Sequence, residues 1–201
     1  MNIKRINSYT DFRFSQTSLY QHGCFLVDEE PYEIEIISDY EAVVRGKDKE
    51  IYTAVIEEFL FFTPHITMFY DENREIVKQY PRAEIFELAI KEIQPSQFYV
   101  DQDKIDAIST FIEKGEDIII QVIKQGEKYI SLDGHTRLYY AVMKGFDRVR
   151  AVMTETDDYI FDFVAEAQKR GIFTPKDLIL VSHEEYEKKW NQYCDEYFSS
   201  K

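Results

Sequence analysis

Residues 133–137 carry the side chains with the clearest chemical potential. They read Asp-Gly-His-Thr-Arg and lie between a predicted strand and a predicted helix. The first turn of a helix presents N–H groups without helical partners and a partial positive charge, which stabilise an anion. Gly134 has no Cβ to hinder a ligand, and Arg137 can form two parallel hydrogen bonds to phosphate oxygens. The segment therefore predicts a phosphate-binding turn.

The remaining side chains of the turn add options for catalysis. His135 can donate a hydrogen bond or move a proton, and Asp133 can hold a divalent cation or orient a hydroxyl group. We therefore predict Asp133 and His135 as catalytic candidates, and Gly134, His135, Thr136 and Arg137 as phosphate-binding residues. The alternative is structural: Asp133 caps the helix, Gly134 makes the turn, and His135 and Arg137 are solvated.

The elements around this turn predict a mixed sheet with helices over residues 84–155. A β-branched run at 118–123 is typical of a buried strand, and 129–132 and 149–153 predict two more strands. Helices are expected over 103–111 and from the turn to about residue 143, where Gly145 follows as a terminator. An apolar-rich segment at 85–93 ends at Gln94-Pro95. We expect an α+β fold.

Two further segments flank this region. Before a boundary near Tyr80-Pro81-Arg82, a helix over 15–23, strands at 32–36, 41–45 and 66–70, and a helix over 51–62 predict a small α+β unit, residues 1–83, of unknown role. After it, residues 156–201 predict a helical extension that packs on the central domain. Tyr186, Trp190, Tyr193 and Tyr197 form an aromatic stripe there, which we expect to lie in the core or at an interface.

Composition limits the possible partners. The chain has 24 Lys and Arg against 38 Asp and Glu, a net charge of −14, which argues against duplex DNA and against anionic membranes. The two cysteines, Cys24 and Cys194, are too few for a disulfide framework, and the N-terminus lacks the apolar stretch of a signal peptide. We expect a cytoplasmic protein without a membrane partner.

Residues 88–154 resemble the ParB/sulfiredoxin-like superfamily. The matching features, in order, are Ile93-Gln94-Pro95-Ser96-Gln97, the 103–111 helix, the two strands, the Asp-Gly-His-Thr-Arg turn, Lys144-Gly145-Phe146 and the 149–153 strand. In that superfamily a Gly-x-x-Arg element at a helix N-terminus binds nucleotide phosphates. The resemblance implies that Gly134 and Arg137, with Gln97 nearby, bind ATP, ADP or CTP with Mg²⁺.

Three branches of the superfamily differ at the turn. Sulfiredoxins place a cysteine before the histidine, where this chain has Gly134, so thiolate chemistry is absent. ParB proteins have an Arg-rich turn, whereas this turn has one arginine and residues 84–155 hold 9 basic and 13 acidic side chains. Free-serine kinases are most similar, with Thr136 in place of a second histidine. Their general-base glutamate aligns with Gln97, an amide that cannot take a proton, although Asp101 or Asp103 could substitute.

These features support two main hypotheses. The first is a ligand-sensing or interaction module that binds a small phosphate ligand, with a protein partner or a second copy meeting its aromatic surface. The alternative is a small-molecule kinase or nucleotide hydrolase that resembles free-serine kinases. An acidic inhibitor that mimics nucleic acid is supported by the net charge alone. Among the other histidines, we expect His65 to be structural and His183 to be solvated.

Overall fold

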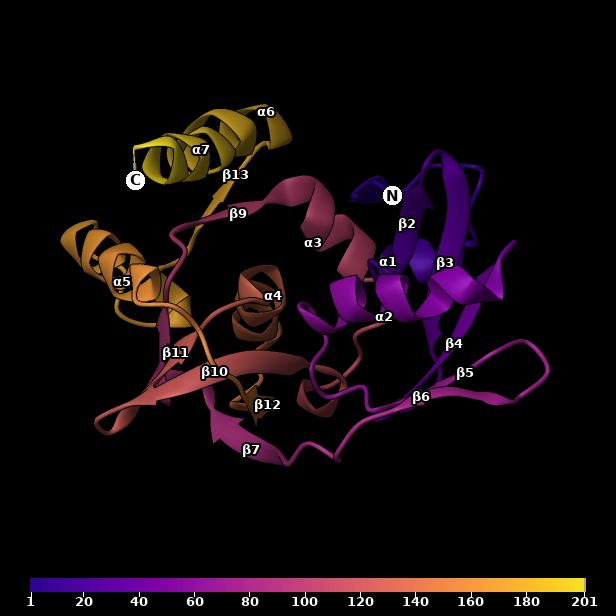
Figure 1. Ribbon diagram of the computed structural model, residues 1–201. Coiled ribbons are helices and arrows are strands. Elements are labelled where there is room, and N and C mark those ends of the chain that lie inside the picture. Colours follow the sequence, from indigo (N-terminus) through magenta and orange to yellow (C-terminus); the bar gives the residue numbers. More distant parts are fainter. Residues whose placement is uncertain (201) are drawn as a thin grey trace. The chain divides into compact units, whose positions relative to one another are not determined.

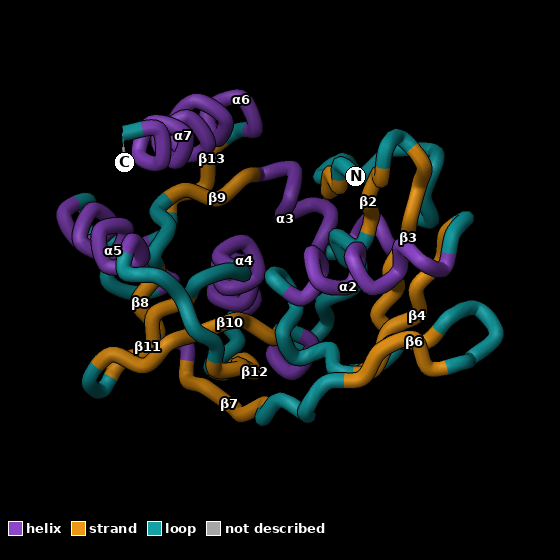
Figure 2. Tube along the Cα trace, in the orientation of Figure 1, coloured by secondary structure: helices purple, strands orange, loops and turns teal. Residues whose placement is uncertain are grey.

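The computed structural model describes residues 1–200 and divides into two compact units, Met1–Glu84 and Ile85–Lys201. Each unit combines a sheet with helices (Figure 2). The predicted α+β class is therefore confirmed. The division falls one residue after the boundary expected from the sequence. No helix within the described residues is long and apolar enough to cross a membrane.

Unit 1 is built on a six-stranded sheet in which the strands follow their sequence order. All neighbours are antiparallel except β4 and β5, which run parallel. The strands are β1 (Ile3–Arg5), β2 (Cys24–Val27), β3 (Glu30–Ile36), β4 (Glu41–Gly46), β5 (Met68–Tyr70) and β6 (Ile76–Gln79), and the helices are α1 (Gln16–Tyr20), η1 (Lys49–Ile51) and α2 (Tyr52–Leu60).

The core of unit 1 lies between α2 and the sheet. Val55, Ile56 and Phe59 of α2 pack with Ile34 of β3 and Phe69 of β5. The spacing of three and four residues on α2 places its apolar side chains on one face, and the alternation along β3 does the same for the strand. Burial of these two faces against each other supplies the hydrophobic stabilisation of the unit.

Unit 2 contains a five-stranded mixed sheet with the strand order β7-β12-β10-β11-β8. Here β8 runs parallel to β11 and β10 parallel to β12, whereas β10–β11 and β12–β7 are antiparallel. The strands are β7 (Ile85–Ala89), β8 (Ile93–Pro95), β10 (Ile119–Gln125), β11 (Lys128–Ser131) and β12 (Arg148–Met153).

A second, two-stranded sheet and a set of helices complete unit 2 (Figure 1). Helix α4 packs in the main core, where Leu138 and Ala141 meet Ile118, Ile120 and Val122 of the β10 region. The remaining elements are β9 (Tyr99–Asp101) and β13 (Ile179–Val181), the helices η2 (Ile90–Glu92), α3 (Gln102–Ile108), η3 (Gly115–Asp117), α4 (His135–Lys144), α5 (Tyr159–Lys169), η4 (Pro175–Asp177), α6 (His183–Tyr186) and α7 (Gln192–Ser199), and the π-helix η5 (Glu187–Asn191).

The tail differs from the expected purely helical extension. Strand β13 interrupts it and pairs in parallel with β9, so that Val181 lies opposite Asp101. Such a pairing joins segments far apart in sequence and leaves no local periodicity to detect. The aromatic stripe packs inward as expected, since Trp190 and Tyr193 lie edge-on to the buried Phe98 ring at 4.9 and 5.3 Å.

Two element boundaries are also corrected. Helix α3 ends at Ile108 rather than at Phe111, and the 3-10 turn η3 follows it from Gly115. Strand β2 was not predicted, because its four residues are all apolar and show no alternation that separates a strand from a helix.

Candidate functional site

The turn between β11 and α4 has the geometry of a helix N-terminus opened by glycine. Gly134 is the N-cap of α4 with φ +83° and ψ 18°, in the left-handed region. The first hydrogen bond of the helix runs from the Leu138 N–H to the Gly134 carbonyl oxygen at 2.9 Å. The N–H groups of His135, Thr136 and Arg137 precede that bond and therefore have no partner within the helix.

A side chain at position 134 would close this turn. A Cβ there would lie 2.6 Å from Ile120 Cγ2 and 3.2 Å from Arg137 Nη2. Glycine is required for both reasons, the positive φ and the close approach of β10. Gly134 is therefore needed to fit the turn against β10 as well as to let a ligand approach the backbone.

Arg137 folds back across the turn instead of extending into solvent. Its Nη1 donates to the Ile119 carbonyl oxygen at 2.7 Å, and its Nη2 donates to Asp133 Oδ2 at 3.1 Å. The Arg137 side chain is 29% exposed and that of Asp133 is 50% exposed. The guanidinium is therefore fixed at one end by the backbone and paired at the other with a carboxylate that water can reach.

His135 is buried in a serine cluster, with 4% of its surface exposed. The Ser96 N–H donates to its Nε2 at 3.2 Å, and Ser131 Oγ lies 3.1 Å from the same nitrogen. Burial lowers the pKa of His135 to about 4, although the Asp133 charge opposes the shift. The imidazole is thus neutral at neutral pH and joins the loop after β8 to the start of α4.

The ends of β8 and β11 bring Gln97 to the same region, because Pro95 and Ser131 lie opposite each other in parallel strands. Gln97 is buried, and its amide nitrogen donates to the Tyr99 carbonyl oxygen and, at 3.3 Å, to Tyr186 Oη. Burial raises the pKa of the Tyr186 hydroxyl well above its usual range, with Asp101 and Asp133 adding smaller contributions.

The structure thus gathers Asp133, Gly134, His135 and Arg137 into one turn. Gln97 is linked to this turn through its neighbour Ser96, whose N–H donates to His135. Thr136 lies in the first turn of α4 and is partly exposed. The sequence analysis gave no role at the site to Ser96, Ser131 or Tyr186. Ser96 was noted only within the Ile93–Gln97 segment, Ser131 was only the end of a strand, and Tyr186 was assigned only to the aromatic stripe.

His183 is not simply solvated, contrary to expectation. Its Nδ1 lies 2.8 Å from Asp101 Oδ2, and the Asp101 hydrogen bond raises the pKa of the His183 imidazole. Asp101 is also the N-cap of α3, where its Oδ1 accepts from the Asp103 N–H at 3.0 Å. Both oxygens of Asp101 therefore have a hydrogen-bond partner, one on α3 and one on His183.

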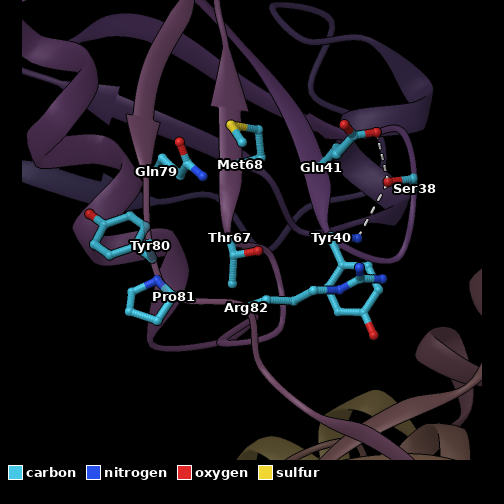
Figure 3. Close-up of a pocket in the computed structure, with 9 residues that line it drawn as sticks. All are labelled: Ser38, Tyr40, Glu41, Thr67, Met68, Gln79, Tyr80, Pro81 and Arg82. Carbon is cyan, nitrogen blue, oxygen red and sulfur yellow. Dashed lines mark hydrogen bonds between the residues drawn. The ribbon is translucent and has the colours of Figure 1, made fainter.

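A hollow of about 470 Å³ lies in unit 1, and none of its lining residues belongs to the turn (Figure 3). Its lining includes Arg82, whose guanidinium carbon lies 3.9 Å from the centre of the Tyr40 ring. Beside Tyr40, Ser38 donates to Glu41 at 3.1 Å and accepts from the Tyr40 N–H at 3.3 Å (Figure 3). None of the residues that line it was predicted as part of a site.

Comparisons with known proteins add little to this geometry. No family model and no curated protein matches the chain. A solved structure that resembles it is that of protein Atu1540 from Agrobacterium tumefaciens, with 14% sequence identity and a TM-score of 0.31. The match covers 47% of this chain and 52% of that one, so the chain spans about half the length of Atu1540.

Proposed function

We propose that unit 2 binds the phosphate groups of a nucleotide at the N-terminus of α4 and acts as a ligand-binding module. The observation that carries the proposal is the fixed position of Arg137 beside three N–H groups that the helix does not use. A phosphate seated there would accept hydrogen bonds from the turn and from the guanidinium at once. ATP, ADP and CTP, with or without Mg²⁺, are the candidate ligands that the ParB/sulfiredoxin-like resemblance suggests.

Phosphate binding requires Arg137 to exchange one hydrogen-bond partner, Asp133, for a phosphate oxygen. Asp133 holds the Arg137 Nη2 group at 3.1 Å, where a phosphate oxygen would bind. The ion pair is partly exposed, and such pairs contribute little to stability, so a phosphate can replace the carboxylate at small cost. The bond from Nη1 to Ile119 can persist throughout and keep the guanidinium in place.

Two observations favour a binding module over a phosphotransferase. The imidazole of His135 is buried and neutral, so it is poorly placed to carry protons to and from a substrate. Gln97 has an amide where a general base would be needed, and its nitrogen is engaged with Tyr99 and Tyr186. Asp133, at 50% exposure, remains the one candidate base of the turn for the alternative function, a small-molecule kinase or nucleotide hydrolase.

A thermal-shift series separates these functions. ATP, ADP and CTP, each with and without Mg²⁺, should raise the melting temperature, whereas adenosine and cytidine should not, because a ligand that binds the folded state stabilises it by mass action. Chromatography of the nucleotide after incubation with a panel of hydroxyl acceptors, free serine included, measures turnover. Absence of any shift contradicts nucleotide binding, and acceptor-dependent ADP formation establishes the kinase instead.

A further inference from the structure

Asp101, Asp103 and His183 form a compact cluster of metal-binding side chains in unit 2, separate from the turn at Gly134. Asp101 is the last residue of β9, Asp103 lies in the first turn of α3, and His183 is the first residue of α6. One ligand atom from each residue lies within 4.8 Å of the other two. The parallel pairing of β9 with β13 produces this meeting, because it delivers α6 to the start of α3.

The distance between two of the ligand atoms, those of Asp101 and His183, suits a coordinated cation, and the third ligand atom, from Asp103, lies within 4.8 Å of both. Asp101 Oδ2 and His183 Nδ1 are 2.8 Å apart. Metal bonds of about 2.0–2.2 Å at tetrahedral or octahedral angles place neighbouring ligand atoms roughly 3.0–3.4 Å apart. A separation of these two atoms by about half an ångström therefore allows a cation to replace the shared proton, and Asp103, which is exposed, completes the set by a movement of its side chain toward the ion.

The buried carboxylate of Asp101 is already oriented toward His183. The Asp101 side chain is 1% exposed, and its Oδ1 accepts the Asp103 N–H at 3.0 Å, which directs Oδ2 toward His183. Such a hydrogen bond to the second oxygen is how ligating carboxylates are commonly held. His183 and Asp103 are exposed, so a cation can enter from solvent without unfolding of the unit.

The donor set indicates the class of metal. Carboxylates alone suit Mg²⁺ and Ca²⁺, whereas imidazole nitrogen favours transition metals such as Zn²⁺. We propose that Asp101, Asp103 and His183 bind one divalent transition-metal ion, with Zn²⁺ as the preferred probe and its remaining coordination positions open to water. The site would fasten α6 to the β9–α3 corner, and it does not depend on nucleotide binding at α4.

The test is metal titration of the full chain, freed of any histidine tag and treated with a chelator. Competition against a chromogenic chelator should give one Zn²⁺ per chain, and Co²⁺ should give visible absorption bands from a nitrogen and oxygen ligand set. Asp103→Asn and His183→Ala should each weaken Zn²⁺ binding by more than about 10-fold. Both positions are exposed, so the variants should fold, which unfolding curves without metal will verify.

Two controls make the result decisive. Asp106→Asn removes the same charge from the exposed face of α3, outside the cluster, and should leave Zn²⁺ affinity within about 2-fold of the parent. Mg²⁺ and Ca²⁺ should bind at least about 10-fold more weakly than Zn²⁺. Absence of stoichiometric Zn²⁺ binding, unchanged affinity in His183→Ala or Asp103→Asn, or equal affinity for Mg²⁺ would each overturn the proposal.

Discussion

Arg137 and Asp133 face each other across the start of α4, with Nη2 3.1 Å from Oδ2, while the other end of the guanidinium is bound to the Ile119 carbonyl oxygen. The pair is four residues apart and brackets Gly134. It occupies the position that a phosphate oxygen would take in the proposed complex. Asp133 is therefore expected to compete with the ligand.

Replacement of Asp133 by asparagine should consequently tighten nucleotide binding. The substitution removes one negative charge near the phosphate and frees Arg137, so we expect a gain in affinity of about 3- to 10-fold at low salt, shrinking as salt is added. Calorimetric titration of ATP, ADP and CTP measures it. Weaker binding in Asp133→Asn would instead assign Asp133 a role in holding Mg²⁺ or the ligand itself.

Replacement of Gly134 by alanine should destabilise the chain more than replacement of Gly126, which has a similar backbone conformation. In Gly134→Ala the added Cβ lies 2.6 Å from Ile120 Cγ2, and alanine is unfavourable at a φ of +83°. We therefore expect a loss of about 2–5 kcal/mol in unfolding free energy. Gly126→Ala, at φ +62° with open space around it, should cost only about 1–2 kcal/mol. Urea unfolding of both variants measures the difference, and equal losses would show that β10 does not crowd the turn.

The buried imidazole predicts a specific loss of stability in acid. The pKa of His135 is about 4 in the folded chain and about 6.5 in an unfolded one, so only the unfolded chain binds the proton between these values. Stability should therefore fall as the pH is lowered through this window, by about 2 kcal/mol from pH 7.5 to pH 5.

Unfolding curves across that range measure the effect, with His135→Gln as the comparison because glutamine does not titrate. The variant will be less stable than the parent chain at every pH. Between pH 7.5 and pH 5, however, its free energy of unfolding should fall by about 2 kcal/mol less than that of the parent chain. An unchanged pH dependence in His135→Gln would mean that the imidazole is accessible to protons in the folded state, which would restore His135 as a proton carrier.

The fluorescence emission of Trp190 should report whether the last helices pack against Phe98. Trp190 is the single tryptophan and lies edge-on to Phe98 at 4.9 Å. Phe98→Ala should shift its emission to longer wavelength and cost about 3–5 kcal/mol, since Phe98 is fully buried. Phe173→Ala, at an exposed position, should change neither quantity appreciably. An unshifted emission maximum in Phe98→Ala would contradict the packing.

Local patterns in the sequence predict much of this fold. The β-branched run around Ile120 predicts its strand, and Gly145 marks the end of α4. These features are predictable because the cause lies within a few residues: side-chain periodicity and capping. Strand β13 and the contact of Asp101 with His183 were missed, because their partners are distant in sequence.

Contacts between residues distant in sequence also limit what can be predicted of the candidate site. The turn from Asp133 to Arg137 is identifiable from residue types, yet the surroundings of His135 include Ser96 and Ser131, and nothing in the sequence pattern places these two serines beside the imidazole. Residue types make His135 a candidate proton carrier, whereas the structure shows its imidazole buried beside Ser96 and Ser131. Residue types predict what a side chain can do, and packing decides whether solvent and ligand can reach it.

The central claim, that Arg137 and the N-terminus of α4 hold a nucleotide phosphate, is tested most directly by calorimetric titration of the nucleotide into Arg137→Ala. A charge-assisted hydrogen bond contributes about 1.5–3 kcal/mol, so affinity should fall about 10- to 100-fold. Lys144→Ala, which removes a positive charge from the opposite end of the same helix, should change it by less than about 2-fold. Nucleotide affinity that is the same in Arg137→Ala and in the parent chain, with both shown to be folded, would contradict the account.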